Sequence, residues 1–206
     1  MQKIGFNQHY GLHDAVVVTE TKTKTRRLEK CLDKLYEAEE RLGEPLVISE
    51  QQVVNEYLVL TKTNAHILYL KPRYKLGEVV AVAQSYKSIF EESLNYALPR
   101  YHWLDDHIDE KGFENKMFVK ASEMPHQIEI TGVRVERLQD ISEEDCISEG
   151  IINGKAISMY TFSNAGLQWG NPRLAFSALI DKPGVGGPGT WERNPWVLVY
   201  SFKKIK

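Results

Sequence analysis

A short basic segment, TKTKTRR at 21–27, holds the side chains best suited to chemistry on a negatively charged group. Four cations fall within seven residues with no acid among them, and such a group can hold phosphates or stabilise a developing oxyanion. The interleaved threonine hydroxyls are poor nucleophiles without a neighbouring base, so a catalytic role needs a partner elsewhere in the chain. Composition alone favours a plainer interpretation, a solvated basic turn leading into the next helix. The four cations are Lys22, Lys24, Arg26 and Arg27.

A second candidate segment, RVERLQDISEEDCISEG at 134–150, is rich in acids. Ser142 predicts the N-cap of a short helix over 143–149, and Gly150 predicts its end. Glu149 lies on the side of this helix that is expected to face inward, so its carboxylate borders the core and needs a partner. An ion pair at the edge of the core is favoured over catalysis. The acids of the first turn suit the positive end of the helix dipole and need no catalytic explanation: Glu143, Glu144 and Asp145.

Several familiar reaction centres are excluded by the rest of the sequence. The six histidines and two cysteines form neither an HExxH nor a CxxC pattern, so no metal site and no cofactor are expected. The group around His102, Asp105 and His107 is more typical of a solvated polar loop. Cys146 follows three acids, which disfavour its thiolate, so it is not a candidate nucleophile. The glycine-rich stretch at 181–191 lacks the Lys-Ser/Thr of a phosphate loop and is interpreted as a mobile loop.

The elements that must position these candidates follow from the hydrophobic pattern. Apolar residues at helical spacing predict an amphipathic helix over 28–42, whereas 12–20 fits either a short helix or a strand. Residues 57–84 predict three strands, the first two around a Lys-Thr-Asn turn, and favour an antiparallel meander. The mixed segment 85–115, with a helical pattern at its start, is interpreted as an insertion over the core.

Two later strands favour a barrel. In HQIEITGVRVERL, Ile128 and Ile130 share one strand face whereas Val133 and Val135 have the opposite parity, and a β-bulge at Gly132 would explain the shift. The tail PWVLVYSFKKI is apolar on both faces, which is typical of a central strand covered on both sides. Because bulges are common where barrels close, we expect an α+β fold in which helices cover the ends of a compact β-barrel.

Length and charge limit the function. A chain of 206 residues suits one substantial domain over 1–206, and a net charge of −2 excludes the strong basicity of a protein that coats a nucleic-acid duplex. Any nucleic-acid site must therefore be local. Only two cysteines occur, and the apolar runs are too short to cross a bilayer. We expect a soluble cytoplasmic protein of a reducing compartment, with no membrane partner.

Four blocks of the sequence carry a family resemblance. They are KTKTRR at 22–27, LGEVVAVAQ at 76–84, RVERLQDISEEDCISEGI at 134–151 and GTWERNPWVLVYSF at 189–202. In these blocks the chain resembles the ASCH-domain proteins of the PUA-like superfamily, particularly their longer phage and prophage form. The resemblance covers nearly the whole chain, with a looser match over 28–56 and 85–115. Its most specific part is the long internal block.

The resemblance implies a PUA-like mixed or antiparallel β-barrel with flanking helices, which binds RNA or a modified nucleoside in a cleft between 21–27 and the 143–149 helix. One small branch of the family is an amidohydrolase that deacetylates acetylated cytidine with a lysine, a threonine and a glutamate. By motif these roles fall on Lys22 as base, Thr25 as nucleophile and Glu149 as the group that orients the lysine or shuttles the proton. A third interpretation is a phage accessory protein that uses the barrel for protein contacts. The expected binding residues are Lys24, Arg26 and Arg27.

Overall fold

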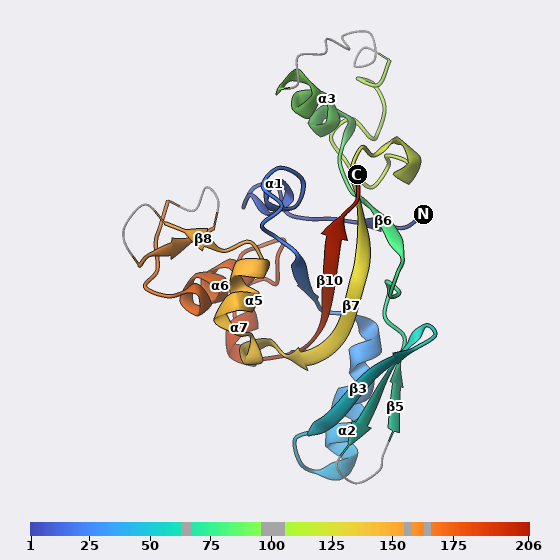
Figure 1. Ribbon diagram of the computed structural model, residues 1–206, viewed down its shortest axis with the longest axis vertical. Coiled ribbons are helices and arrows are strands. Elements are labelled where there is room, and N and C mark those ends of the chain that lie inside the picture. The colour runs from blue at the N-terminus through green and yellow to red at the C-terminus, as the bar shows by residue number, and fades with distance from the viewer. Residues whose placement is uncertain (63–66, 96–105, 155–157, 163–165) are drawn as a thin grey trace. The chain divides into compact units, whose positions relative to one another are not determined.

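The computed structural model describes the chain except for residues 63–66, 96–105, 155–157 and 163–165 (Figure 1). Its helices and three separate β-sheets confirm the expected α+β class. Among the described strands, none of the sheets closes into a barrel. Contacts divide the chain into two compact units. The first comprises Met1–Phe6, Val79–Glu129 and Lys204–Lys206, and the second comprises Asn7–Glu78 and Ile130–Lys203.

The largest sheet has five strands. In order across the sheet they are β1 (Lys3–Ile4), β6 (Val79–Val82), β7 (Gln127–Arg137), β10 (Trp196–Lys204) and β2 (Lys24–Arg27). β10 runs antiparallel to β2, with Tyr200 opposite Thr25. The first five residues of β10 are all buried. This confirms the central strand, covered on both faces, that its apolar sequence predicted.

β7 changes its phase near Gly132, as its sequence predicted. Ile128 and Ile130 are buried at the start of the strand, and Val135, which has the opposite parity, is buried further along. A Cβ at Gly132 would lie 3.3 Å from the side chain of Ser201 on β10, so a side chain here would crowd the neighbouring strand. The phase change lets one long strand bury residues of both parities.

Besides the helix over 33–42, the second unit contains four described α-helices. They are α1 (Leu12–Val17), α5 (Glu143–Ser148), α6 (Pro172–Ile180) and α7 (Thr190–Arg193). α5 contacts both α6 and β2, and Figure 1 shows α5, α6 and α7 as one group. α1 settles the choice left open for 12–20 in favour of a helix. In the segment interpreted as a mobile loop, residues 182–187 form hydrogen-bonded turns, and α7 follows.

The small sheet is the meander expected within 57–84, with one strand changed. Its order is β3 (Ile48–Val54), β4 (Tyr57–Lys62) and β5 (Ile67–Leu70), all antiparallel. The predicted third strand is instead β6 of the large sheet, so that part of the prediction was wrong. Period-two alternation identifies a strand but not its partner. The predicted turn lies largely outside the described residues.

The helix expected over 28–42 is α2 (Asp33–Leu42), preceded by the 3-10 turn η1 (Lys30–Leu32).

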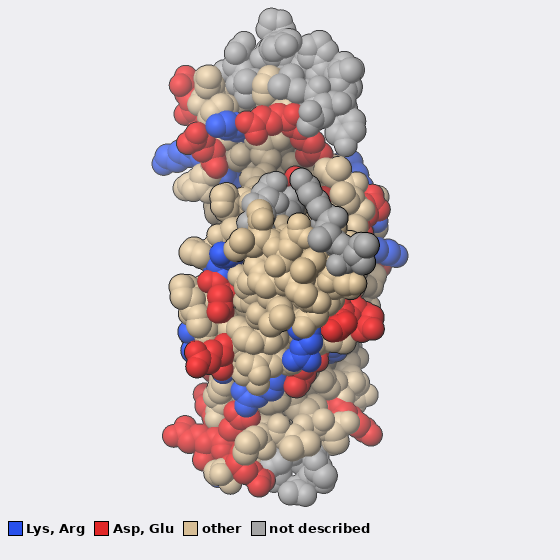
Figure 2. Space-filling view, turned by 90° about the vertical axis from the view of Figure 1, so that its left-hand side faces the viewer, with Lys and Arg blue, Asp and Glu red and all other residues tan. Residues whose placement is uncertain are grey.

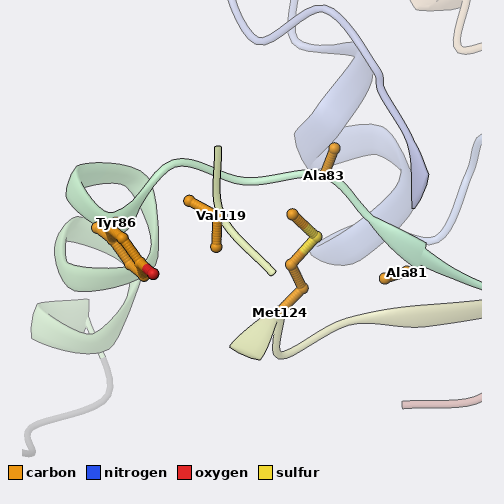
Figure 3. Packing of buried hydrophobic residues seen from close by; sticks show 5 residues of the cluster. All are labelled: Ala81, Ala83, Tyr86, Val119 and Met124. Carbon is orange, nitrogen blue, oxygen red and sulfur yellow. The ribbon is translucent and has the colours of Figure 1, made fainter. Parts of the chain in front are cut away.

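The first unit has a small core of its own. Figure 3 shows its buried side chains, Ala81, Ala83, Tyr86, Val119 and Met124. Two of them flank or belong to β6, and Tyr86 begins α3 (Tyr86–Asn95), the helix anticipated at the start of the 85–115 segment. His102 and Asp105 of the polar group lie outside the described residues. The remaining short elements are η2 (Ala121–Glu123), η3 (Leu138–Asp140), β8 (Ile152–Asn153) and β9 (Tyr160–Thr161).

Within the described parts of the chain, no helix is both long enough and apolar enough to span a membrane.

Candidate functional site

The basic segment is an extended strand and not a solvated turn. β2 pairs with the buried strand β10, and strand alternation places Lys24 and Arg26 on one face of β2 and Thr25 and Arg27 on the other. The face of Lys24 and Arg26 lies against helix α5, because both side chains contact its acids. Lys22, just before the strand, reaches the same helix.

Lys22 and Glu149 form a buried ion pair. The Lys22 ammonium is 2.5 Å from Glu149 Oε2, and it also donates to the backbone carbonyls of Glu149 (2.7 Å) and Lys24 (2.8 Å). Only 3 % of Lys22 and 5 % of Glu149 are exposed. Burial lowers the pKa of Lys22, and the nearby carboxylate opposes this only in part. Glu149 thus has an ion-pair partner at the edge of the core, the arrangement that its place in the sequence favoured.

Asp145 has a larger role than the sequence suggested. Its backbone amide donates to Ser142 Oγ (3.1 Å), as expected at a capped helix start. Its carboxylate, however, accepts hydrogen bonds from Lys24, Arg26 and Arg134. Burial alone would raise the pKa of Asp145, but these three cations outweigh it and lower the pKa to about 2. Compensation of the helix dipole was therefore an incomplete explanation of this acid.

Arg26 joins the acids of α5 to strand β7. Its guanidinium donates to Glu136 (2.7 Å), Asp145 (2.7 Å) and Glu149 (3.0 Å), and its side chain is almost fully buried. Burial would lower the pKa of Arg26, but Glu149 and Glu136 raise it, so the guanidinium stays charged. Arg134, two residues before Glu136 on the same face of β7, also donates to Glu136 (3.1 Å).

These side chains form one group, which we call the charge cluster. Its members are Lys22, Lys24, Arg26, Arg134, Glu136, Asp145 and Glu149. Four cations therefore face three carboxylates, which leaves one positive charge in excess. The side chains of Lys24 and Arg134 are 26 % and 38 % exposed, whereas those of Lys22 and Arg26 are at most 2 % exposed. The excess charge is consequently offered to solvent by Lys24 and Arg134.

Thr25 and Arg27 are not brought into the charge cluster. Thr25 is 5 % exposed and lies on the other face of β2, and no hydrogen bond joins its hydroxyl to Lys22 or Glu149 in the described structure. The structure therefore unites two members of the predicted catalytic set and separates the third by strand parity. The proposed catalytic roles stay predictions.

A pattern in the sequence could have revealed the charge cluster. Three cations recur at period two in the basic segment, at 22, 24 and 26, and two acids stand four apart, Asp145 and Glu149, on one face of a helix. Two charged faces of opposite sign suggest that strand and helix pack against each other. The contribution of Arg134 and Glu136 follows likewise from their shared parity in β7.

The two thiols are poor nucleophiles, and the described acids and histidines do not form a metal-binding group. Burial raises the pKa of Cys146 to about 12 and that of Cys31 to about 11, and neighbouring carboxylates add to the shift. Among described residues, no group of three or more His, Cys, Asp or Glu side chains is arranged to hold a metal ion.

An open groove lies beside the charge cluster. Its volume is about 620 Å³, and Arg134 belongs both to its wall and to the charge cluster. One wall comes from β3 and the other from β7. The lining residues are 48–53, Leu76 and 131–134.

Comparison with known proteins gave no support from similarity, because no family model, curated protein or solved structure matched this chain.

Proposed function

We propose that this protein is a PUA-like, ASCH-domain protein that binds a nucleoside or single-stranded RNA at the surface formed by β2, β7 and α5. The proposal draws on the sequence resemblance and on the way the matching blocks come together. KTKTRR contains β2, RVERLQDISEEDCISEGI spans the end of β7 and α5, and the last block contains most of β10, which pairs with β2. Blocks far apart in the sequence thus supply adjacent elements, as expected if they serve one site.

The observation that carries the proposal is the excess positive charge of the charge cluster. Asp145, Glu149 and Glu136 hold the cations in fixed positions without neutralising all of them. Lys24 and Arg134 both reach solvent and share Asp145 as a partner. Two cations held together in this way can meet one phosphate group at little entropic cost, because their side chains are already ordered.

The one face of the protein drawn in Figure 2 agrees with a local site. On the face shown in Figure 2, basic and acidic side chains are interspersed around a broad uncharged area, with no continuous basic surface among the coloured residues. The net charge of −2 agrees with this distribution. A ligand with a few phosphates suits such a protein better than a long duplex does.

Titration of a labelled single-stranded RNA and of free nucleosides, each at two salt concentrations, tests the proposal. We expect binding that weakens with salt and with Lys24→Ala, because Lys24 is an exposed member of the charge cluster. Lys120→Ala is the matched control, since the Lys120 side chain is 79 % exposed and lies outside the charge cluster. If neither RNA nor any nucleoside binds the unaltered chain, the proposal is wrong.

A second candidate function, amide hydrolysis of an acylated cytidine, is favoured by one observation. Lys22 is a buried amine whose pKa is lowered, and Glu149 touches it, which is the arrangement expected of a lysine base and its orienting carboxylate. Because Thr25 lies on the other face of β2, its hydroxyl would have to reach the Lys22 amine past the strand.

Incubation with acetylated cytidine and detection of released cytidine tests this second function. We expect Thr25→Ala and Glu149→Gln to abolish turnover if the roles are as proposed, and Thr23→Ala to preserve it. Turnover that survives both Thr25→Ala and Glu149→Gln would remove the assigned roles. The folding of each variant is checked first by circular dichroism, because Glu149 is buried.

A further inference from the structure

The edge of β7 that faces away from β10 pairs with β6 over residues 127–129, and further along it has two more partners. At Ile130 the strand exchanges backbone hydrogen bonds with the residues just before β6: Ile130 N–H donates to Glu78 O (3.0 Å), and Gly77 N–H donates to Ile130 O (2.8 Å). At Val135 the partner is a side chain. The amide of Gln51 donates to Val135 O and accepts from Val135 N–H, both at 2.7 Å.

Both pairings lie on the same edge of β7. Leu138 N–H donates to Pro195 O, next to β10, and alternation along the strand therefore turns the peptide groups of Val135 away from β10. Ile130 has the other parity, but the phase change at Gly132 brings its peptide groups to that same outer edge. Between these two points, no described strand pairs with β7 on this edge. The interval is residues 131–134, the part of β7 that lines the groove.

Gln51 shows what kind of group this edge accepts. A primary amide presents one donor beside one acceptor in a plane, and Gln51 satisfies a peptide N–H and a peptide C=O with that pair. The edges of nucleobases present the same pattern, a ring or exocyclic N–H next to a carbonyl oxygen or ring nitrogen. A base placed beside Gln51 in the groove would find comparable backbone groups.

The walls of the groove suit a planar ring with polar edges. Its volume of about 620 Å³ lies within the usual range of small-molecule sites. Apolar side chains offer surfaces for the faces of a ring, and hydroxyl, amide and guanidinium groups offer hydrogen bonds. The apolar group is Ile48, Val53, Leu76 and Val133, and the polar group is Ser49, Glu50, Gln51, Gln52, Thr131 and Arg134.

An extended peptide is the other ligand that adds to a strand edge, and the groove suits it less well. The interval holds four residues, and the phase change within it interrupts the regular spacing of peptide groups. An added strand gains affinity from a series of main-chain hydrogen bonds, which an interval this short cannot supply. A single base needs only one donor and acceptor pair.

We propose that the groove between β3 and β7 is a nucleobase subsite, in which the edge of one base pairs with the backbone of β7 beside Gln51. This inference rests on the proposed function, because Arg134 links the groove to the phosphate-binding surface at Lys24. It adds the location and chemistry of base recognition: one unpaired base enters the groove, and the adjoining phosphate lies over Arg134 and Lys24.

A side chain that fills the groove tests the inference. Leu76 is 50 % exposed, so Leu76→Trp blocks the groove without disturbing the core. Leu174→Trp is the matched control, because Leu174 is 52 % exposed on α6, away from the groove. We expect Leu76→Trp to weaken RNA and nucleoside binding at least tenfold and Leu174→Trp to leave it unchanged. An RNA made abasic throughout should bind the unaltered chain as weakly as intact RNA binds Leu76→Trp.

The outcomes separate this inference from the function on which it rests. Undiminished RNA binding by Leu76→Trp, together with weakened binding by Lys24→Ala, overturns the subsite and keeps the proposed function. No binding of RNA or nucleosides by the unaltered chain overturns both. A third outcome concerns peptides. If the unaltered chain binds an unstructured valine- and threonine-rich decapeptide but no nucleoside, and Leu76→Trp abolishes peptide binding, the groove is a peptide site and the inference is overturned.

Discussion

At the scale of single residues, the charge cluster is maintained because removing any one of its members costs folding stability. Lys22 and Arg26 are buried, and each carboxylate contacts more than one basic side chain. A buried ionic network gains little over an apolar core, because its members lose their hydration. Removing one member is nevertheless expensive, since the remaining charges stay buried without compensation. The site is therefore sensitive to substitutions that leave its shape unchanged.

Glu149→Gln should destabilise the protein strongly. It leaves Lys22 and Arg26 without a carboxylate that contacts both, and we expect the free energy of unfolding to fall by about 3–5 kcal/mol. Urea denaturation followed by circular dichroism measures this loss. Glu143→Gln, at an exposed position in the first turn of α5, should change stability by no more than about 0.5 kcal/mol. Equal effects of the two substitutions would contradict the network.

Acid should weaken the charge cluster through Asp145. Its pKa in the folded chain is about 2, below the value of about 3.9 for an unfolded aspartate, so its stabilising effect is complete above the unfolded value. That effect is lost as the pH falls from about 5 to 2. We expect the free energy of unfolding to drop over this window by about 2 kcal/mol on account of Asp145 alone. Asp145→Asn should show a correspondingly flatter pH profile in urea denaturation at pH 3 and pH 6.

At the scale of elements, α5 is a short helix whose ends decide where its acids lie. Ser142 caps its first turn, and Gly150 follows its end with a φ of 102°, a conformation that side chains rarely adopt. A Cβ at Gly150 would also lie 3.2 Å from Leu12. Between these two residues, Asp145 and Glu149 stand four apart and face β2.

Ser142→Ala should loosen α5 and the acids that it carries. Loss of the cap leaves the Asp145 N–H without its acceptor, and we expect a cost of about 1 kcal/mol in unfolding free energy. Ser142→Asp keeps a capping oxygen and should restore most of the stability. Thermal denaturation of the three proteins compares them. If Ser142→Asp were as unstable as Ser142→Ala, capping would not be the role of this residue.

The same elements show which parts of the structure could be predicted from the sequence. Local signals were reliable at Ser142 and Gly150 and in the buried strand β10, because each depends on neighbouring residues only. Partners over long distance were less predictable: β6 was assigned to the meander because its alternation shows that it is a strand but not what it pairs with. β3 was missed because its sequence, ISEQQVV, is largely polar and exposed.

The candidate site was predicted in part for a similar reason. Glu149 was singled out because a carboxylate bordering the core requires a partner, and the structure supplies Lys22. Asp145 was underestimated because the helix dipole already explained an acid in that position. The separation of Thr25 from Lys22 follows from strand parity, which became decisive only once the basic segment was known to be a strand and not a turn.

At the scale of the whole molecule, weak overall charge limits the electrostatic part of binding. The net charge is −2, and the charge cluster offers two cations to solvent, Lys24 and Arg134. A ligand therefore displaces few counterions when it binds. Discrimination between ligands has to come from contacts other than charge.

The salt dependence of RNA binding should accordingly be shallow. If Lys24 and Arg134 together neutralise one phosphate, the slope of log K against log salt for single-stranded RNA should be about −0.7. Fluorescence anisotropy over a series of potassium chloride concentrations measures this slope. Lys24→Ala should make it shallower still, whereas Lys120→Ala should leave it unchanged. A slope several times steeper would place the main phosphate contacts elsewhere on the molecule.

The ion pair between Lys22 and Glu149 also constrains when the basic segment can fold during synthesis. Its two residues are separated by 127 positions, and among the described strands β2 pairs with β10 alone, at residues 198–201. On the ribosome, which makes the N-terminal part first, the segment at 21–27 therefore emerges long before its acids and its partner strand exist. The four cations of the segment therefore lack these partners until residue 201 has been synthesised. Folding then buries two of them, Lys22 and Arg26, which leaves fewer cations for nonspecific attraction to nucleic acid.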